Sequence, residues 1–119
     1  MAFRTLYLGP VLALLAAAPA WANVTLVLAQ PGPRAVVSLP PQVLVLSFSA
    51  PPQVAFSEVT VVNAAGNPIP AGRPEAVRGQ PFELAVPVQI TEPGRYTVNW
   101  NIRSYNQRST GRYSFKVTQ

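Results

Sequence analysis

The sequence predicts an all-β protein, an immunoglobulin-like Greek-key β-sandwich of about seven short strands. Apolar and polar residues alternate with a period of two in several segments, most regularly over 93–104 and 111–118, as expected for strands with one buried face. Turn-forming residues recur roughly every eight to twelve residues, and most of the 14 prolines lie at expected strand ends. After residue 22 no stretch has a sustained helical period.

The chain of 119 residues is too short for more than one ordinary domain, and residues 1–22 are predicted to be a secretory signal peptide. Arg4 supplies positive charge, residues 6–18 are apolar, and Ala20-Trp21-Ala22 has the small-x-small pattern of a cleavage site. We expect cleavage before Asn23, a domain over residues 23–119 and a periplasmic location. A retained membrane anchor is disfavoured, because the apolar run is shorter than the ~20 residues of a spanning helix.

Composition limits the partners and the compartment. Residues 23–119 contain eight Arg and Lys and four Glu, a net charge of +4 (8 − 4), with no Cys, His or Asp. A domain without disulfides depends on packing, which suits a bacterial periplasm. The basic residues are dispersed, and together with export this argues against nucleic acid as a partner. No membrane span is expected after cleavage.

The strands before residue 93 are predicted from short runs of β-branched and aromatic residues bounded by turn signals. These runs cover residues 25–29, 36–39, 42–48, 58–62 and 82–86. Residues 42–48 are apolar on both sides, which predicts a strand inside a sheet. The Pro-, Gly- and Ala-rich segment 63–80 is expected to form loops and one weak edge strand.

The last two strands, 93–104 and 111–118, are predicted to form an antiparallel hairpin that carries the core. Trp100 is expected to fill the space that the disulfide between the sheets occupies in antibody domains. The polar segment 104–110 is expected to be the connecting loop and the place of any function.

The residues that common enzyme mechanisms need are missing. Cys and His are absent, Lys116 is the one lysine, and the four glutamates are scattered. Catalytic residues are therefore not expected. Metal binding is expected to be weak, because only a terminal amine, carboxylates, amides and phenols remain as donors. No cofactor is expected.

The outer face of the predicted hairpin is basic and rich in amides. It could bind a carboxylate, a sugar or an anionic head group, or it could be an ordinary solvated face whose charges prevent edge pairing. The candidate partner-binding residues on this face and in the loop are Tyr105, Gln107, Arg108, Arg103 and Arg112.

Several motifs, in their order and spacing, resemble the periplasmic copper-resistance proteins of the CopC type. They are a Leu-Val pair at 26–27 followed by Pro31, Leu-x-Phe-Ser-x-Pro at 46–51, Phe-Ser-x-Val-x-Val at 56–61, Pro-Gly-x-Tyr-x-Val-x-Trp at 93–100 and Gly-x-x-x-Phe-x-Val at 111–117. The resemblance covers nearly all of residues 23–119, and it implies the fold predicted above.

The resemblance also implies a copper site, whose ligands are replaced in this chain. In the family, Cu(II) is held by the terminal amine and side chain of a first His and by an Asp and a His in a Ser-x-Asp-Gly-His loop. The equivalent positions here are Asn23, Asn106 and Arg108, in a loop one residue shorter. A guanidinium 4 Å from Cu(II) would oppose binding by roughly a few kcal/mol at an effective dielectric near 20. The fold is therefore expected to be retained and the usual copper site lost.

Two functions follow from these observations. The first is a non-catalytic periplasmic protein linked to copper homeostasis by resemblance, with a copper-handling membrane or periplasmic protein as its partner. The alternative is an immunoglobulin-like interaction module that binds a protein or an anionic ligand through segment 104–110 and the adjacent basic face.

Overall fold

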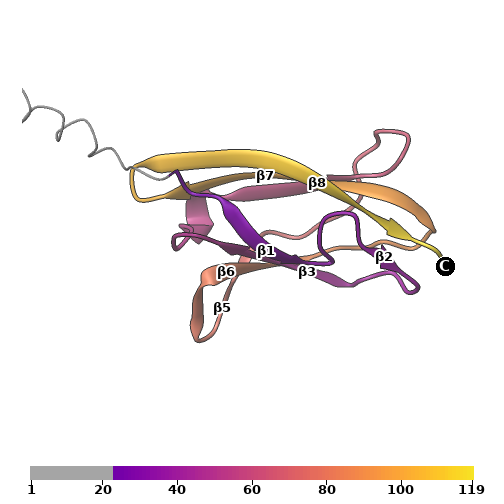
Figure 1. The fold of residues 1–119 in the computed structure, drawn as a ribbon, viewed down its shortest axis with the longest axis horizontal. Helices are drawn as coiled ribbons and strands as arrows, with labels where there is room; N and C mark the ends of the chain where they lie inside the picture. The colour runs from indigo at the N-terminus through magenta and orange to yellow at the C-terminus, as the bar shows by residue number, and fades with distance from the viewer. Residues whose placement is uncertain (1–22) are drawn as a thin grey trace, which may run out of the picture.

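A computed structural model describes residues 23–119 as two four-stranded β-sheets packed face to face (Figure 1). One sheet has the strand order β1-β3-β6-β5 and the other the order β2-β8-β7-β4. The elements are β1 (Leu26–Gln30), β2 (Val36–Val37), β3 (Val43–Phe48), the 3-10 turn η1 (Val54–Phe56), β4 (Glu58–Val62), β5 (Glu75–Val77), β6 (Gln80–Pro87), β7 (Gly94–Ser104) and β8 (Gln107–Val117). The predicted all-β sandwich is confirmed.

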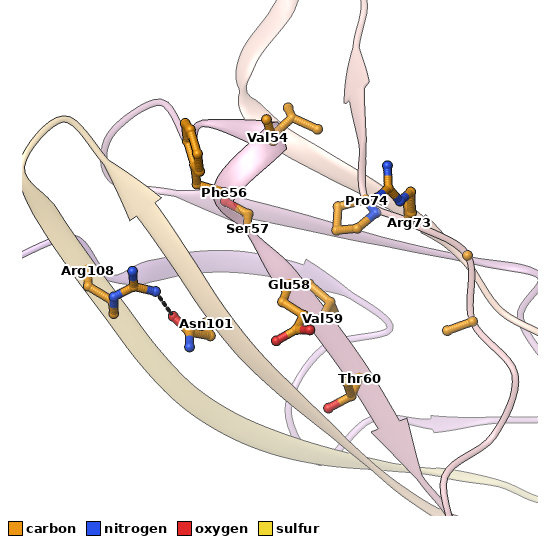
Figure 2. A pocket seen from close by; sticks show the side chains of 13 residues that line it. Val54, Phe56, Ser57, Glu58, Val59, Thr60, Arg73, Pro74, Asn101 and Arg108 are labelled. Carbon is orange, nitrogen blue, oxygen red and sulfur yellow. Dashed lines mark hydrogen bonds between the residues drawn. The ribbon is translucent and has the colours of Figure 1, made fainter.

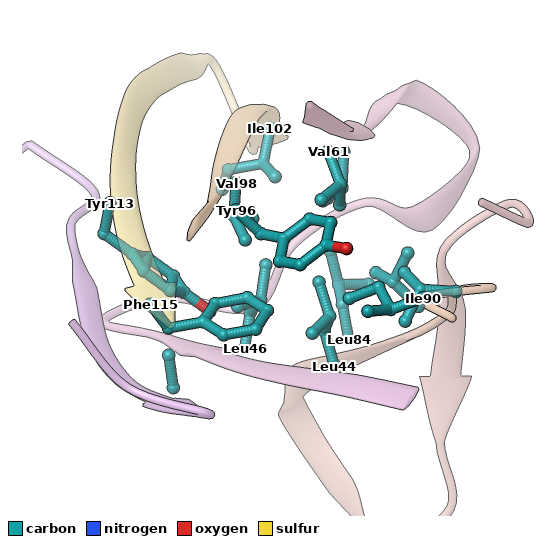
Figure 3. Packing of buried hydrophobic residues seen from close by; sticks show 14 of the residues in the cluster. Leu44, Leu46, Val61, Leu84, Ile90, Tyr96, Val98, Ile102, Tyr113 and Phe115 are labelled. Atoms are coloured by element: carbon teal, nitrogen blue, oxygen red, sulfur yellow. The ribbon is translucent and has the colours of Figure 1, made fainter. Parts of the chain in front are cut away.

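The core lies between the sheets and is built from alternate residues of the paired strands (Figure 3). Its side chains with 0–1% exposure include Leu44 and Leu46 in β3, Leu84 and Val86 in β6, Val98 and Ile102 in β7, and Phe115 and Val117 in β8. Burying one such side chain stabilises the folded state by about 1.5–3 kcal/mol. Apolar packing therefore holds a domain that has no cysteine.

Aromatic side chains join the two sheets near the β7–β8 turn. The Trp100 ring on β7 meets Phe48 of the opposite sheet edge-on, with ring centroids 6.2 Å apart. It also contacts Tyr113 of β8, with a centroid separation of 6.3 Å. Trp100 thus lies between the sheets, in the position expected for a side chain that fills the space of the missing disulfide.

The predicted strands before residue 93 are present, and their limits differ from the observed ones by at most two residues. The weak edge strand expected within 63–80 is β5. The strand predicted over 42–48 lies inside its sheet, as expected. However, only one of its faces is fully buried, because Val43 is 44% exposed.

The prediction of a seven-residue loop at 104–110 is wrong. β7 and β8 are each 11 residues long and pair along their whole length, so only Tyr105 and Asn106 form the turn. Tyr105 has a φ of 55°, a left-handed conformation of the kind that tight hairpin turns use. Residues 107–110 are polar on both faces, so hydrophobic alternation gave no strand signal there.

Residues 1–22, the predicted signal peptide, lie outside the described residues. Among the residues that the structure describes, no helix is long and apolar enough to cross a membrane.

The Tyr96 hydroxyl fixes the start of β7 by donating a 2.6 Å hydrogen bond to the backbone oxygen of Glu92. The ring itself is buried and stacks on Phe115. Tyr96→Phe keeps this stacking but leaves the carbonyl of Glu92 without its partner. We expect a loss of about 1 kcal/mol in the free energy of unfolding, measured by urea denaturation. An unchanged unfolding midpoint would show that this bond does not stabilise the fold.

The Tyr113 hydroxyl ties β8 to the segment after β1 by donating to the backbone oxygen of Pro31 at 2.8 Å. Burial raises the pKa of Tyr113 from 10.0 to about 12. The unfolded chain therefore loses this proton at a lower pH than the folded chain, so the contribution is complete below pH 10 and is lost as the pH rises toward 12.

Between these two pH values we expect the unfolding free energy of the native chain to fall on the order of 1 kcal/mol more than that of Tyr113→Phe. Urea titrations at each pH measure this difference. Parallel curves for the two proteins would contradict it.

Candidate functional site

The β7–β8 turn and the start of the described chain together enclose a depression of about 390 Å³. Asn23 and Asn106, two positions equivalent to the family's copper ligands, both line it. The other lining residues are Val24, Ser49, Ala50, Ser104, Tyr105 and Gln107. Residues more than 80 positions apart in sequence are therefore brought together at one end of the sandwich.

Hydrogen bonds and burial hold the two walls of this depression. The backbone N–H of Thr25 donates to Ser49 Oγ at 2.9 Å, and the N–H of Ser49 donates to the backbone oxygen of Thr25 at 2.9 Å. On the turn side, the fully buried Ser104 donates its hydroxyl to the backbone oxygen of Pro51 at 2.6 Å. Val24 is 6% exposed and packs in the core. The neighbours of Asn23 and Asn106 are thus anchored.

Arg108 does not line this depression. It belongs to β8, and its side chain lies on the outer face of the sheet, where Nη1 donates to Asn101 Oδ1 at 2.7 Å (Figure 2). There it borders a cleft of about 500 Å³ whose walls also include Glu58 and Arg73. The guanidinium is therefore engaged on the outer face and is not turned toward Asn106.

Gln107, and not Arg108, is the residue of β8 that lines the depression. It is the first residue of β8 and lines the depression together with Asn23 and Asn106. Side chains alternate between the faces of a strand, so Gln107 and Arg108 lie on opposite faces of the sheet. Sequence reasoning missed Gln107 as a wall of this depression because it treated residues 104–110 as a loop.

The partner-binding candidates divide into two groups. Arg103 and Arg108 are directly paired across β7 and β8, and Arg112 lies further along β8 on the same outer face. The guanidinium carbon of Arg103 also lies 6.0 Å from the ring centroid of Phe56. The second group, Tyr105 and Gln107, lies at the turn, where Tyr105 is 71% exposed.

The donors around the depression do not fit Cu(II), which prefers imidazole nitrogen and charged oxygen ligands. Asn23, Asn106 and Gln107 offer neutral amides, and the serines offer neutral hydroxyls. Within residues 23–119 no three His, Cys, Asp or Glu side chains are grouped so that they could hold a metal ion.

The fold and the terminal depression define the class of protein. Two facing sheets of four strands, with a depression between the first described residues and the final hairpin turn, form a small β-sandwich of the CopC fold. A family model described as the CopC domain matches residues 26–118. The chain belongs to the CopC domain family.

Individual relatives agree with this assignment. The chain is 33% identical over 102 residues to Protein YobA of Escherichia coli K12 and of Shigella flexneri, covering 82% of this chain and 80% of each relative. CopC from Methylosinus trichosporium OB3b superposes with a TM-score of 0.75 at 23% identity, covering 81% of this chain and 94% of that one. PcoC, a methionine-rich copper resistance protein from Escherichia coli, gives 0.71 at 24% identity, with 82% and 100% covered.

Proposed function

We propose that this chain is a non-catalytic periplasmic protein linked to copper homeostasis, in which the family's usual Cu(II) site is lost or much weakened. Membership of the CopC domain family supports the link to copper. The predicted signal peptide over residues 1–22 supports export to the periplasm. Its partner would be a copper-handling membrane or periplasmic protein, and its own activity would need neither catalytic residues nor a cofactor.

The observation that carries the proposal is the amide lining of the terminal depression. Asn23, Asn106 and Gln107 line the depression with neutral amides, whereas a copper carrier needs charged or imidazole donors. Neutral amide oxygens bind Cu(II) weakly in water, because they compete poorly with the ion's hydration shell. The remaining nitrogen donor is the amine that cleavage before Asn23 would create.

The alternative function is an interaction module without a metal. The exposed aromatic ring of Tyr105 at the hairpin turn favours it, because single Tyr and Arg side chains often carry much of the energy of an interface. Tyr105→Ala should then weaken binding of the partner without changing the fold. This variant removes the Tyr105 phenol but keeps the amides of Asn23, Asn106 and Gln107, so it separates the two functions.

Calorimetric titration of protein cut before Asn23 with Cu(II) tests the main proposal. The proposal predicts weak binding, with a dissociation constant of about 10 μM or higher. Glycine-free buffer and a matched titration of Asn106→Ala serve as the controls. Submicromolar binding that Asn106→Ala abolishes would show that the site is functional and would overturn the proposal.

A further inference from the structure

Within residues 23–119, one edge of β8 has no neighbouring strand over most of its length. β7 pairs with β8 from end to end on one side. On the other side β2 pairs only with the last residues, Val36 with Lys116 and Val37 with Val117. In the described part of the chain, residues 107–113 therefore form a free sheet edge (Figure 1).

The register of the hairpin identifies the backbone groups that this edge exposes. In an antiparallel pair, alternate residues direct both N–H and C=O away from the partner strand. Ser114 and Lys116 do so, since Ser114 accepts from the N–H of Arg34 at 2.7 Å and Lys116 donates to the oxygen of Ala35 at 2.9 Å. Arg108, Thr110 and Arg112 lie an even number of residues before Ser114. Their backbone N–H and C=O groups therefore also point away from β7, toward the free edge.

A groove of about 670 Å³ lies beside this edge. Its far wall is the N-terminal segment, including Val24 and Leu26, and its floor includes Trp100 and Tyr113. These side chains are mostly apolar. Arg108, Thr110 and Arg112 line the groove from β8. The groove therefore combines a row of backbone donors and acceptors without partners in residues 23–119, a partly apolar lining and two arginines.

Charge decides which strand this edge accepts. Two copies of the chain pairing antiparallel about Thr110 would place Arg108 of each copy opposite Arg112 of the other. Like charges directly opposite each other destabilise a strand pair. An incoming strand with acidic residues at those two positions would instead form favourable cross-strand pairs, with Arg112 directly and with Arg108 once its guanidinium leaves Asn101. The edge is thus poorly suited to self-association and suited to an acidic strand.

We propose that the free edge of β8 at Arg108–Arg112 binds an extended acidic segment of a partner protein as an added antiparallel strand. Alternation of side chains defines the segment. Acidic residues four positions apart face Arg108 and Arg112, a small or β-branched residue between them faces Thr110, and the two intervening residues are apolar and enter the groove. This edge acts without metal, although its groove shares Asn23 and Val24 with the terminal depression.

Binding of two peptides, GSEVTVEGS and its lysine counterpart GSKVTVKGS, tests this proposal by NMR titration of the chain from Asn23 onward. Both peptides are acetylated and amidated, so they differ only in the two charged residues. We expect the acidic peptide to shift the backbone amide signals of Arg108, Thr110 and Arg112. We expect the lysine peptide to bind at least about tenfold more weakly.

Substitutions of Thr110 separate backbone pairing from simple charge attraction. Thr110→Pro removes an N–H that points toward the free edge and no hydrogen bond to β7. We therefore expect it to weaken binding of the acidic peptide at least about tenfold. Thr110→Val keeps that N–H and should bind as the native chain does. Circular dichroism verifies that both variants fold, and methylating the peptide amides that face β8 provides the same test if Thr110→Pro does not fold.

Three outcomes would overturn the proposal. They are equal affinity for both peptides, unchanged affinity when the peptide amides are methylated, and shifts confined to residues outside β8 and the groove.

Discussion

Gly111→Ala should destabilise the domain by about 3 kcal/mol. An added Cβ would lie 2.7 Å from Cη2 and 2.9 Å from Cε2 of Trp100, with Cζ2 closer still. These are atoms of a rigid indole that is held between Phe48 and Tyr113. Alanine in a strand otherwise stabilises relative to glycine by roughly 0.5–1 kcal/mol, so a large loss would identify the ring contact as its cause.

Urea denaturation followed by Trp100 fluorescence measures this loss, since the other tryptophan of the chain is Trp21 in the predicted signal peptide. The control is the same substitution in a Trp100→Leu background, followed by circular dichroism. Leucine removes the ring, so the additional effect of Gly111→Ala should fall to within about 1 kcal/mol of zero. An equal loss in both backgrounds would show that the ring contact is not responsible.

Restoring the family donors around the terminal depression should create a Cu(II) site. We expect the variant Asn23→His, Asn106→Asp and Gln107→His to bind Cu(II) at least about 100-fold more tightly than the native chain, a gain of about 2.7 kcal/mol. The three changes supply two imidazoles and a carboxylate beside the terminal amine, a donor set of the kind that Cu(II) prefers. Competition with a chelator of known affinity measures the gain.

A matched variant tests which residue of β8 faces the depression. It carries Asn23→His and Asn106→Asp together with Arg108→His. It therefore adds the same two imidazoles and one carboxylate as the variant with Gln107→His. Because the side chain at position 108 lies on the outer face with Asn101, this variant should bind more weakly than the one with Gln107→His. A stronger gain from Arg108→His would mean that the turn is longer than the structure shows.

Hydrophobic alternation was sufficient to predict most of the fold. β4 and the inner face of β7 follow from residues at every second position, because burying one face of a sheet requires that pattern. The resemblance to CopC proteins was also available from motifs that are mostly structural, such as the Tyr and Trp of β7. These residues determine packing, so a resemblance carried by them predicts the fold.

The terminal site was less predictable, because it depends on a turn that has no sequence signal. Two-residue hairpin turns usually contain glycine or the pair Asn-Gly, whereas this one is Tyr105-Asn106. The missing signal concealed the continuation of β8 through residues 107–110. Without that signal, the sequence also did not show that side chains alternate along residues 107–110, so that Gln107 faces the depression and Arg108 does not. The free edge of β8 could not be predicted either, because it depends on how far β2 extends.

The most direct test of the central claim, a CopC fold without the usual copper site, is electron paramagnetic resonance of the chain from Asn23 onward. One equivalent of Cu(II) is added in the presence of a weak competing chelator, with the restored variant containing Gln107→His in parallel. We expect the native chain to leave the signal of the chelator complex unchanged and the variant to replace it with a nitrogen-rich signal. A nitrogen-rich signal from the native chain would contradict the loss of the site.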